Sequence, residues 1–162
     1  MGNLKLTSLD FEDGGEIPRE CGYKNGNKAP ILQWELDSGG GNELGGDDSP
    51  ASFALIMDDP DAMGAVGKVW VHWVVWNIEP DVWEYGPGDA AEGITDFGEV
   101  GYGGPAPPDK RHTYVFKLYA LDDGGYGAHK NSGNVPGTKA DLEKAMEGHI
   151  IEQATLTGTY AP

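Results

Sequence analysis

The sequence predicts a mainly β protein, an antiparallel β-sandwich with a single clear helix. Two observations favour this class: short apolar or alternating runs recur along the chain, and loops rich in glycine separate them. With 162 residues, the chain is long enough to bury a sizeable core but short for two domains. We therefore expect a single domain over residues 1–162.

Strands are predicted where apolar residues alternate or run together. The segments with this pattern are Leu4–Leu9, Ile31–Leu36, Phe53–Asp58, Val69–Asn77, His112–Leu121 and Glu152–Tyr160. In the segment His112–Leu121, alternation places His112 and Tyr114 on one face, directly after a proline-rich loop. Both side chains should therefore be held together at one end of the sandwich.

The segment Val69–Asn77 is apolar on both faces, which predicts a central strand. Strict alternation divides its side chains into Trp70, His72, Val74 and Trp76 on one face and Val71, Trp73 and Val75 on the other. His72 should be largely buried, and a buried imidazole needs a hydrogen-bond partner, for which Asp59 or Asp61 is the natural candidate. His72 is then either a structural histidine of the core or a ligand-binding one, and spacing alone leaves both open.

One helix is predicted near the end of the chain. Its apolar stripe comprises Leu142, Ala145, Met146, His149 and Ile150, after a start at Thr138 with Asp141 in the first turn. We expect His149 to pack at the end of this helix without a chemical role, and His129 to be a solvated loop residue. The long connection Trp83–Pro108 is expected to be functional, because long ordered loops often are.

Charge excludes two classes of partner. The chain has 11 Lys and Arg against 27 Asp and Glu, a formal net charge of −16, so it lacks the basic patches that nucleic acids and anionic membranes require. The longest nearly apolar run, Val69–Trp76, is too short to cross a bilayer, and the N-terminus has no secretory or lipidation pattern. We expect a cytoplasmic protein without membrane insertion, and the acidic excess suggests adaptation to a salty cytoplasm.

Several formal motif matches fail on their chemistry. The run Gly101–Ala106 has the spacing of a dinucleotide fingerprint, but prolines stand where a helix must open. The run Asp59–Gly64 begins like a calcium loop, but Met63 replaces a ligand. Cys21 is the one cysteine, so no intrachain disulfide or cysteine-rich zinc site is possible, and an idle thiol is expected. We predict no metal and no cofactor.

The chemistry-bearing residues come from three segments. Asp58–Asp61 ends one strand, Trp70 and His72 lie in the central strand, and Ala106–Pro108 leads into His112 and Tyr114. Two imidazoles, a phenol and loop amides suit a phosphate or carboxylate group. Trp70 would form a wall of such a pocket or stack on a cationic head group.

Three runs carry a resemblance to a known family. They are SFALIMDDPDA (Ser52–Ala62), VHWVVWNI (Val71–Ile78) and GYGGPAPP (Gly101–Pro108), the last followed by His112–Leu121. In this order and spacing they resemble the phosphatidylethanolamine-binding protein (PEBP) family, which includes Raf kinase inhibitor protein, and especially its short bacterial and archaeal branch. The resemblance implies a Greek-key antiparallel β-sandwich with one or two peripheral helices and an anion pocket at one end.

By motif position, the resemblance also implies the residues of that pocket. They are Asp59, Trp70, His72, His112 and Tyr114, with Asp61, Gly104, Ala106, Pro107 and Pro108 at the rim. Met63 departs from the family, which usually has proline there, so one pocket wall is expected to differ. The short segment Asp109–Arg111 before His112 is expected to change the pocket's width, with Arg111 adding a cation. Because the chain ends at Pro162, we expect no C-terminal helix over the pocket.

The leading hypothesis is a binding protein, not an enzyme, that captures a phosphate- or carboxylate-bearing small molecule or a phosphorylated group of a partner. His72 and His112 would donate to the anion, Asp59 would orient an imidazole, and loop amides would complete the cradle. One alternative is an inhibitor or regulator of a kinase or protease, as some members of the family are. Another is an enzyme that uses these side chains as acid and base on a phosphoester, although no nucleophile is evident.

Overall fold

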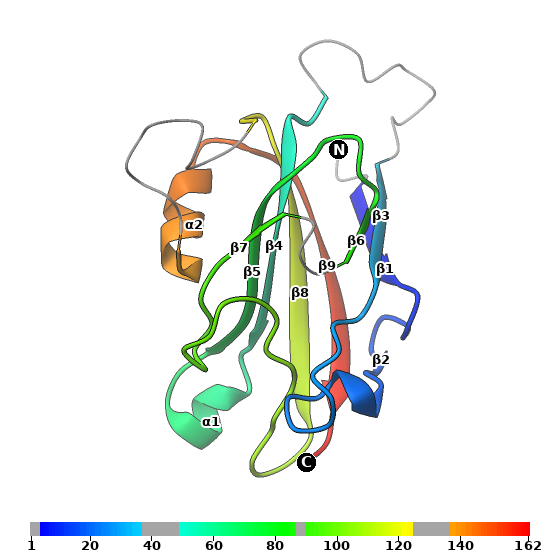
Figure 1. The fold of residues 1–162 in the computed structure, drawn as a ribbon, viewed down its shortest axis with the longest axis vertical. Coiled ribbons are helices and arrows are strands. Elements are labelled where there is room, and N and C mark those ends of the chain that lie inside the picture. The colour runs from blue at the N-terminus through cyan, green and yellow to red at the C-terminus, as the bar shows by residue number, and fades with distance from the viewer. Residues whose placement is uncertain (1–3, 37–48, 87–89, 125–136) are drawn as a thin grey trace.

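A computed structural model describes residues 4–36, 49–86, 90–124 and 137–162. Its strands form two sheets (Figure 1), with the orders β1-β3-β6 and β2-β9-β8-β4-β5-β7. The smaller sheet consists of β1 (Leu4–Ser8), β3 (Leu32–Leu36) and β6 (Glu84–Tyr85). The larger consists of β2 (Gly15–Glu16), β9 (Ile150–Tyr160), β8 (His112–Leu121), β4 (Ser52–Asp59), β5 (Trp70–Ile78) and β7 (Ala91–Glu92). The predicted mainly β class is confirmed.

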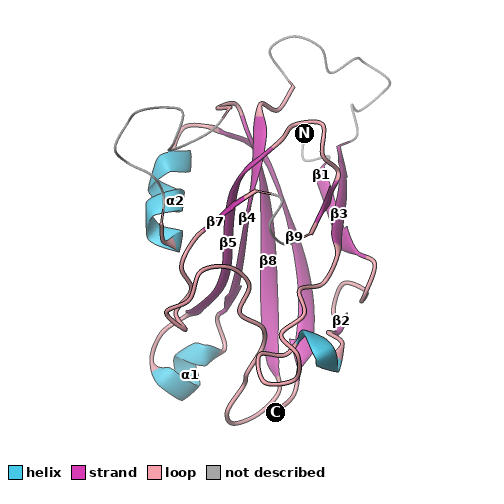
Figure 2. Cartoon of the chain, viewed as in Figure 1, coloured by secondary structure: helices cyan, strands magenta, loops and turns pink. Residues whose placement is uncertain are grey.

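Helices are few, as Figure 2 shows. They are α1 (Ala62–Val66), α2 (Lys139–Met146) and the 3-10 turn Arg19–Cys21. The named strands pair antiparallel except β2, which runs parallel to β9 over two residues and so departs from the expected all-antiparallel sheet. Within the described ranges, no helix is long and apolar enough to span a membrane.

One core joins the two sheets. It contains Leu4, Leu6, Leu32 and Trp34 from the smaller sheet and Phe53, Leu55, Met57, Trp73, Val75, Phe116 and Leu118 from the larger. Every residue of β4 is buried, because this strand lies between β5 and β8 and both of its faces are covered. β8 has the predicted bounds, and the other long strands differ from the prediction by one or two residues at an end.

The second face of the larger sheet is covered by α2, through a smaller core that includes Leu142 and Met146. The start at Thr138 is confirmed, since its hydroxyl accepts a hydrogen bond from the Asp141 amide at 3.1 Å. The predicted end is wrong: the helix stops at Met146.

The apolar stripe therefore does not extend to His149 and Ile150. Gly148 has φ +80°, the left-handed conformation that commonly terminates a helix. Ile150 already belongs to β9 and is 41% exposed. His149 lies beside Asp122 Oδ1, with its Nδ1 at 2.7 Å. His129, predicted as a loop residue, lies outside the described residues.

A β-bulge in β5 sets the direction of His72. Met57 pairs with Trp73 but Asp58 pairs with Val71, so His72 is an extra residue in the ladder. It therefore lies on the same side as Trp73, where its ring meets the Tyr114 ring edge-on at 5.2 Å. The prediction that it faces the same way as Val74 is wrong, because strict alternation does not hold across a bulge.

Candidate functional site

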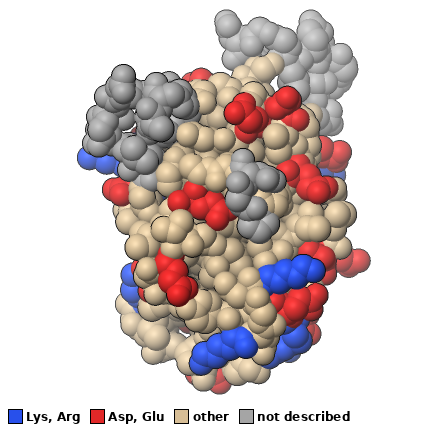
Figure 3. Space-filling model, in the orientation of Figure 1, with Lys and Arg blue, Asp and Glu red and all other residues tan. Residues whose placement is uncertain are grey.

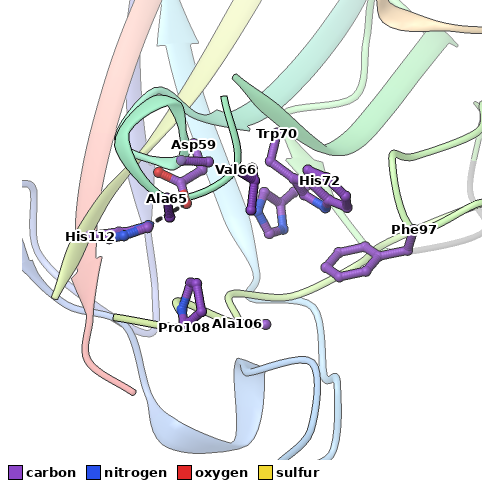
Figure 4. Close-up of a pocket in the computed structure, with 10 residues that line it drawn as sticks. Asp59, Ala65, Val66, Trp70, His72, Phe97, Ala106, Pro108 and His112 are labelled. Atoms are coloured by element: carbon purple, nitrogen blue, oxygen red, sulfur yellow. Dashed lines mark hydrogen bonds and ion pairs between the residues drawn. The ribbon is translucent and has the colours of Figure 1, made fainter. Parts of the chain in front are cut away.

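A cavity of about 130 Å³ lies where β4 ends and where β5 and β8 begin. Its walls, shown in Figure 4, are Asp59, Ala62, Ala65, Val66, Trp70, His72, Phe97, Ala106, Pro108 and His112. Clefts for drug-sized ligands are usually larger, about 300–1,000 Å³. The cavity therefore has room for a small chemical group only.

His112 is held between two carboxylates. Its Nδ1 lies 2.6 Å from Asp59 Oδ2, and its Nε2 lies 2.8 Å from Asp109 Oδ1. Carboxylates accept hydrogen bonds, so both ring nitrogens donate and the ring is an imidazolium. Burial lowers the pKa of His112, but the carboxylates of Asp59 and Asp109 outweigh it and raise that pKa above its ordinary value.

His72 has a different environment. Its Nδ1 donates to the Gly103 carbonyl at 2.6 Å, so the predicted partnership with Asp59 or Asp61 is wrong. Burial lowers the pKa of His72, and the opposing effects of the Gly103 carbonyl and of Asp59 do not restore it. The ring is therefore neutral at pH 7, with its proton on Nδ1. The lone pair on Nε2 is left for a ligand.

Some buried polar atoms have no hydrogen-bond partner. Among the described residues they include Asp59 Oδ1 and Trp70 Nε1 at this end of the sheet, and the indole nitrogens of Trp34 and Trp73 within the core. Native proteins seldom leave such atoms unpaired, so the two at this end of the sheet indicate a place where a ligand or water completes the bonding. Burial, and after it the charge of Asp59, raises the pKa of Tyr114, so its hydroxyl remains a donor.

The structure divides the predicted site residues into two groups. Asp59, Trp70, His72, Ala106, Pro108 and His112 line the cavity, and their role in binding stays a prediction. The others do not line it: Tyr114 is buried beside the two histidine rings, and the exposed Asp61 accepts a hydrogen bond from the Thr113 amide at 2.8 Å.

The two remaining rim residues, Pro107 and Gly104, lie in the loop before β8 and do not line the cavity. Pro107 lines a separate depression of about 310 Å³ together with Arg19 and Lys24. At Gly104, a Cβ atom would come within 2.0 Å of the Cys21 carbonyl oxygen, so a side chain does not fit there. Gly104 therefore serves close packing of the loop. Burial raises the pKa of the Cys21 thiol to about 12, in keeping with an idle cysteine.

Sequence reasoning missed several features of the cavity. The short helix α1 supplies Ala62, Ala65 and Val66, whereas Met63 itself is 55% exposed. Phe97 comes from the long loop that was expected to be functional, and its ring stacks on Tyr23 at 4.0 Å. Arg111 is not among the lining residues, because its guanidinium donates to Thr159 Oγ1.

Positive side chains lie near this end despite the global charge. Several Lys and Arg side chains appear in the lower half of Figure 3, the end at which α1 and the C-terminus lie in Figure 1. Lys68 Nζ is 5.8 Å from the centre of the Trp70 ring and 2.9 Å from Asp96 Oδ1. Asp and Glu side chains lie among them in the same view, so this end of the molecule carries charges of both signs.

A comparison with known protein families identifies the family of this chain. The family model described as phosphatidylethanolamine-binding protein matches residues 7–161. The chain belongs to the phosphatidylethanolamine-binding protein family. Relatives of this PEBP chain include a UPF0098 protein of Methanothermobacter thermautotrophicus, which is 38% identical over an alignment of 169 positions that covers 97% of this chain and 98% of that protein.

Solved structures of PEBP homologues share the fold over nearly the whole chain. A PEBP homologue from Chlamydia trachomatis has a TM-score of 0.80 at 33% identity, covering 99% of this chain and 98% of its own. E. coli YbcL, a member of the mammalian PEBP family, has a TM-score of 0.78 at 27% identity and covers 98% of both chains. The assignment to the bacterial and archaeal branch of the PEBP family is thereby confirmed.

Proposed function

We propose that this PEBP-family protein binds the anionic head of a small phosphate- or carboxylate-bearing molecule, or a phosphorylated group of a partner protein, between His72 and His112. The observation that carries the proposal is the convergence of these two histidines with Asp59 around one small cavity. The unpartnered Trp70 Nε1 adds a further buried donor to the same walls.

Each polar residue has a distinct task in this proposal. Asp59 fixes the His112 ring and favours its charged form, so that the cavity carries a cation until the pH rises through the raised pKa of His112. His72 accepts from a proton on the ligand when neutral, or donates to the ligand when protonated. In either case one proton lies between the ligand and His72 in the complex. At high pH, both the free ligand and the free His72 ring have lost this proton.

The two alternatives have weaker support. An acid–base role in catalysis would fall to His72, because both nitrogens of His112 are engaged with carboxylates, but the residues that line the cavity include no hydroxyl, thiol or amine as a nucleophile. A role as a kinase or protease regulator would use the proline-rich loop beside the cavity, and no described contact identifies such a target. Binding without turnover therefore remains the proposal.

The global charge of −16 opposes any anionic ligand. At about 1 M salt, charges are screened within roughly 3 Å, so surface carboxylates would scarcely affect a ligand held by direct contacts. We therefore also propose that the protein works in a salty cytoplasm.

Calorimetric titration with methyl phosphate tests the binding site. We expect tighter binding at pH 6 than at pH 8, because the shared proton is available at the lower pH. His72→Ala should weaken binding at pH 6 by about tenfold or more, the usual size of a lost hydrogen bond to a charged group. His149→Ala is the control: it removes another imidazole ring, at the other end of β8, and the affinity for methyl phosphate should not change. Equal binding at both pH values, or unchanged binding in His72→Ala, would contradict the proposal.

A further inference from the structure

We propose that Asp109 is an internal competitor for the ligand, because its carboxylate occupies the hydrogen-bond donor of His112 that an anion would use. This inference rests on the proposed function and adds a property to the same site. An incoming anion has to displace the Asp109 carboxylate before it reaches His112 Nε2. The affinity of the resting protein for anions is therefore lower than the cavity itself would allow.

The hydrogen bonds of His112 leave an anion one point of entry. Nδ1 is 2.6 Å from Asp59 Oδ2, and both of these side chains are buried, with 0% and 4% exposure. Nε2 is bonded to Asp109, whose side chain is 44% exposed. The buried pair has no room to separate, whereas the Asp109 carboxylate has solvent to move into. Nε2 is thus the position where exchange is possible.

The charges permit this exchange. One imidazolium between two carboxylates carries a net charge of −1, and replacing the Asp109 carboxylate with a singly charged anion leaves that charge unchanged. When Asp109 turns away, the remaining pair of Asp59 and His112 is neutral and offers a free N–H. The Asp109 carboxylate is itself the kind of group that we propose the site to bind.

The position of Asp109 in the chain makes it an effective competitor. It lies three residues before His112, in the short segment between Pro108 and β8. A tethered group of this kind acts at an effective concentration of about millimolar or more. Free anions at lower concentration therefore compete poorly unless they also contact His72 and the other cavity walls.

Competition and simple charge repulsion predict different results for two probes. A competitor lowers the affinity of every ligand that needs His112 Nε2 by the same factor, whatever the charge of that ligand. Repulsion through space weakens methyl phosphate, about half of which carries a second charge at pH 6, more than singly charged acetate, and it fades in salt. Methyl phosphate and acetate, each carrying one methyl group, separate the two explanations.

The experiment titrates both probes at pH 6 into the wild type, Asp109→Ala, Asp109→Asn and Asp122→Ala, in low and high salt. We choose pH 6 because the buried Asp59 stays beside His112 Nδ1 in the variants and favours the protonated ring. Asp122 is the matched control, because its Oδ1 also lies 2.7 Å from a histidine nitrogen, at the other end of β8. We expect Asp109→Ala to bind both probes about tenfold more tightly, by similar factors in both salts. Asp109→Asn, which keeps an amide acceptor, should show a smaller gain, and Asp122→Ala none.

The outcomes also separate this inference from the proposed function. If the wild type binds methyl phosphate and Asp109→Ala binds it equally or less tightly, the competitor is refuted while the binding site stands. A gain confined to methyl phosphate that disappears in salt refutes competition in favour of repulsion. Binding by Asp109→Ala alone supports the competitor. If no variant binds either probe, the proposed function fails and this inference fails with it.

Discussion

Asp58 and Asp59 are neighbours at the end of β4, equally buried at 3% exposure, but they face opposite sides of the larger sheet. Asp58 accepts a hydrogen bond from Lys139 Nζ of α2 at 2.7 Å. Asp59 accepts one from His112 Nδ1 of β8 at 2.6 Å, on the side of the cavity. The two carboxylates have the same chemistry and burial, and they differ in the partner.

The partner decides what each carboxylate does. The Lys139 ammonium belongs to α2, so the pair of Asp58 and Lys139 links the sheet to that helix. An imidazole changes its charge near neutral pH, so the pair of Asp59 and His112 responds to pH and to ligands. One face of the strand end is thus structural, and the other carries the candidate site.

The largest effect is expected on the structural face. Lys139→Met leaves the Asp58 carboxylate buried without its cation, which typically lowers the free energy of unfolding by about 3–5 kcal/mol. Urea denaturation at pH 7 measures this loss. The double variant Asp58→Asn with Lys139→Met should recover most of it, because no unpaired charge remains. A single-variant loss below about 1 kcal/mol would show that the pair does not hold α2.

A second effect is expected on the cavity face, in the response to pH. In the folded state, the pKa of His112 lies above 6.5 and the pKa of His72 lies below it. The stability from His112 is therefore fully present below pH 6.5 and is lost as the pH rises through its raised pKa. The stability from a neutral His72 is present above pH 6.5 and is lost as the pH falls through its lowered pKa.

NMR titration of the imidazole C–H signals, assigned with His72→Ala and His112→Ala, measures both values. We expect His112 to titrate at higher pH than His72 by a clear margin. The destabilisation caused by Lys139→Met should be the same at pH 6 and pH 8, in contrast to the histidines. The reverse order of the two titrations would contradict the assignment of charge within the cavity.

The smallest effect is expected at the exposed pair of Asp122 and His149, whose side chains are 47% and 42% exposed. Asp122→Asn should change the free energy of unfolding by no more than about 1 kcal/mol, because solvent screens an exposed ion pair. Urea denaturation in low and high salt measures it. A loss as large as that of Lys139→Met would mean that burial is not what separates these aspartate pairs.

Much of the fold was predictable because its strands obey simple periodicity. β8 lies between β4 and β9, its face of His112, Tyr114 and Phe116 is buried, and its bounds followed directly from alternation. The direction of the His72 side chain was not predictable in the same way. A one-residue bulge moves every later side chain of the strand to the opposite face of the sheet. The end of α2 was missed for another reason. Ile150 continues the helical spacing by coincidence, although Gly148 was a visible stop signal.

The residues of the site were easier to predict from the sequence than the hydrogen bonds between them. The sequence correctly predicted that Asp59, His72 and His112 lie at one end of the sheet. The expectation that a carboxylate partners the buried His72 was wrong, because a backbone carbonyl of the loop takes that place. The role of Asp109 depends on how a three-residue segment turns before β8, which no periodicity describes. The five residues of α1 are too few to show a helical pattern.

The single cysteine gives the protein a built-in reporter of local opening. Cys21 is 2% exposed, its pKa is raised to about 12, and its carbonyl lies against Gly104 of the loop that borders the cavity. A thiol reagent therefore reacts only after this segment separates from the loop. The labelling rate of the unmodified protein measures how often that happens, and a ligand that holds the loop in place should slow it.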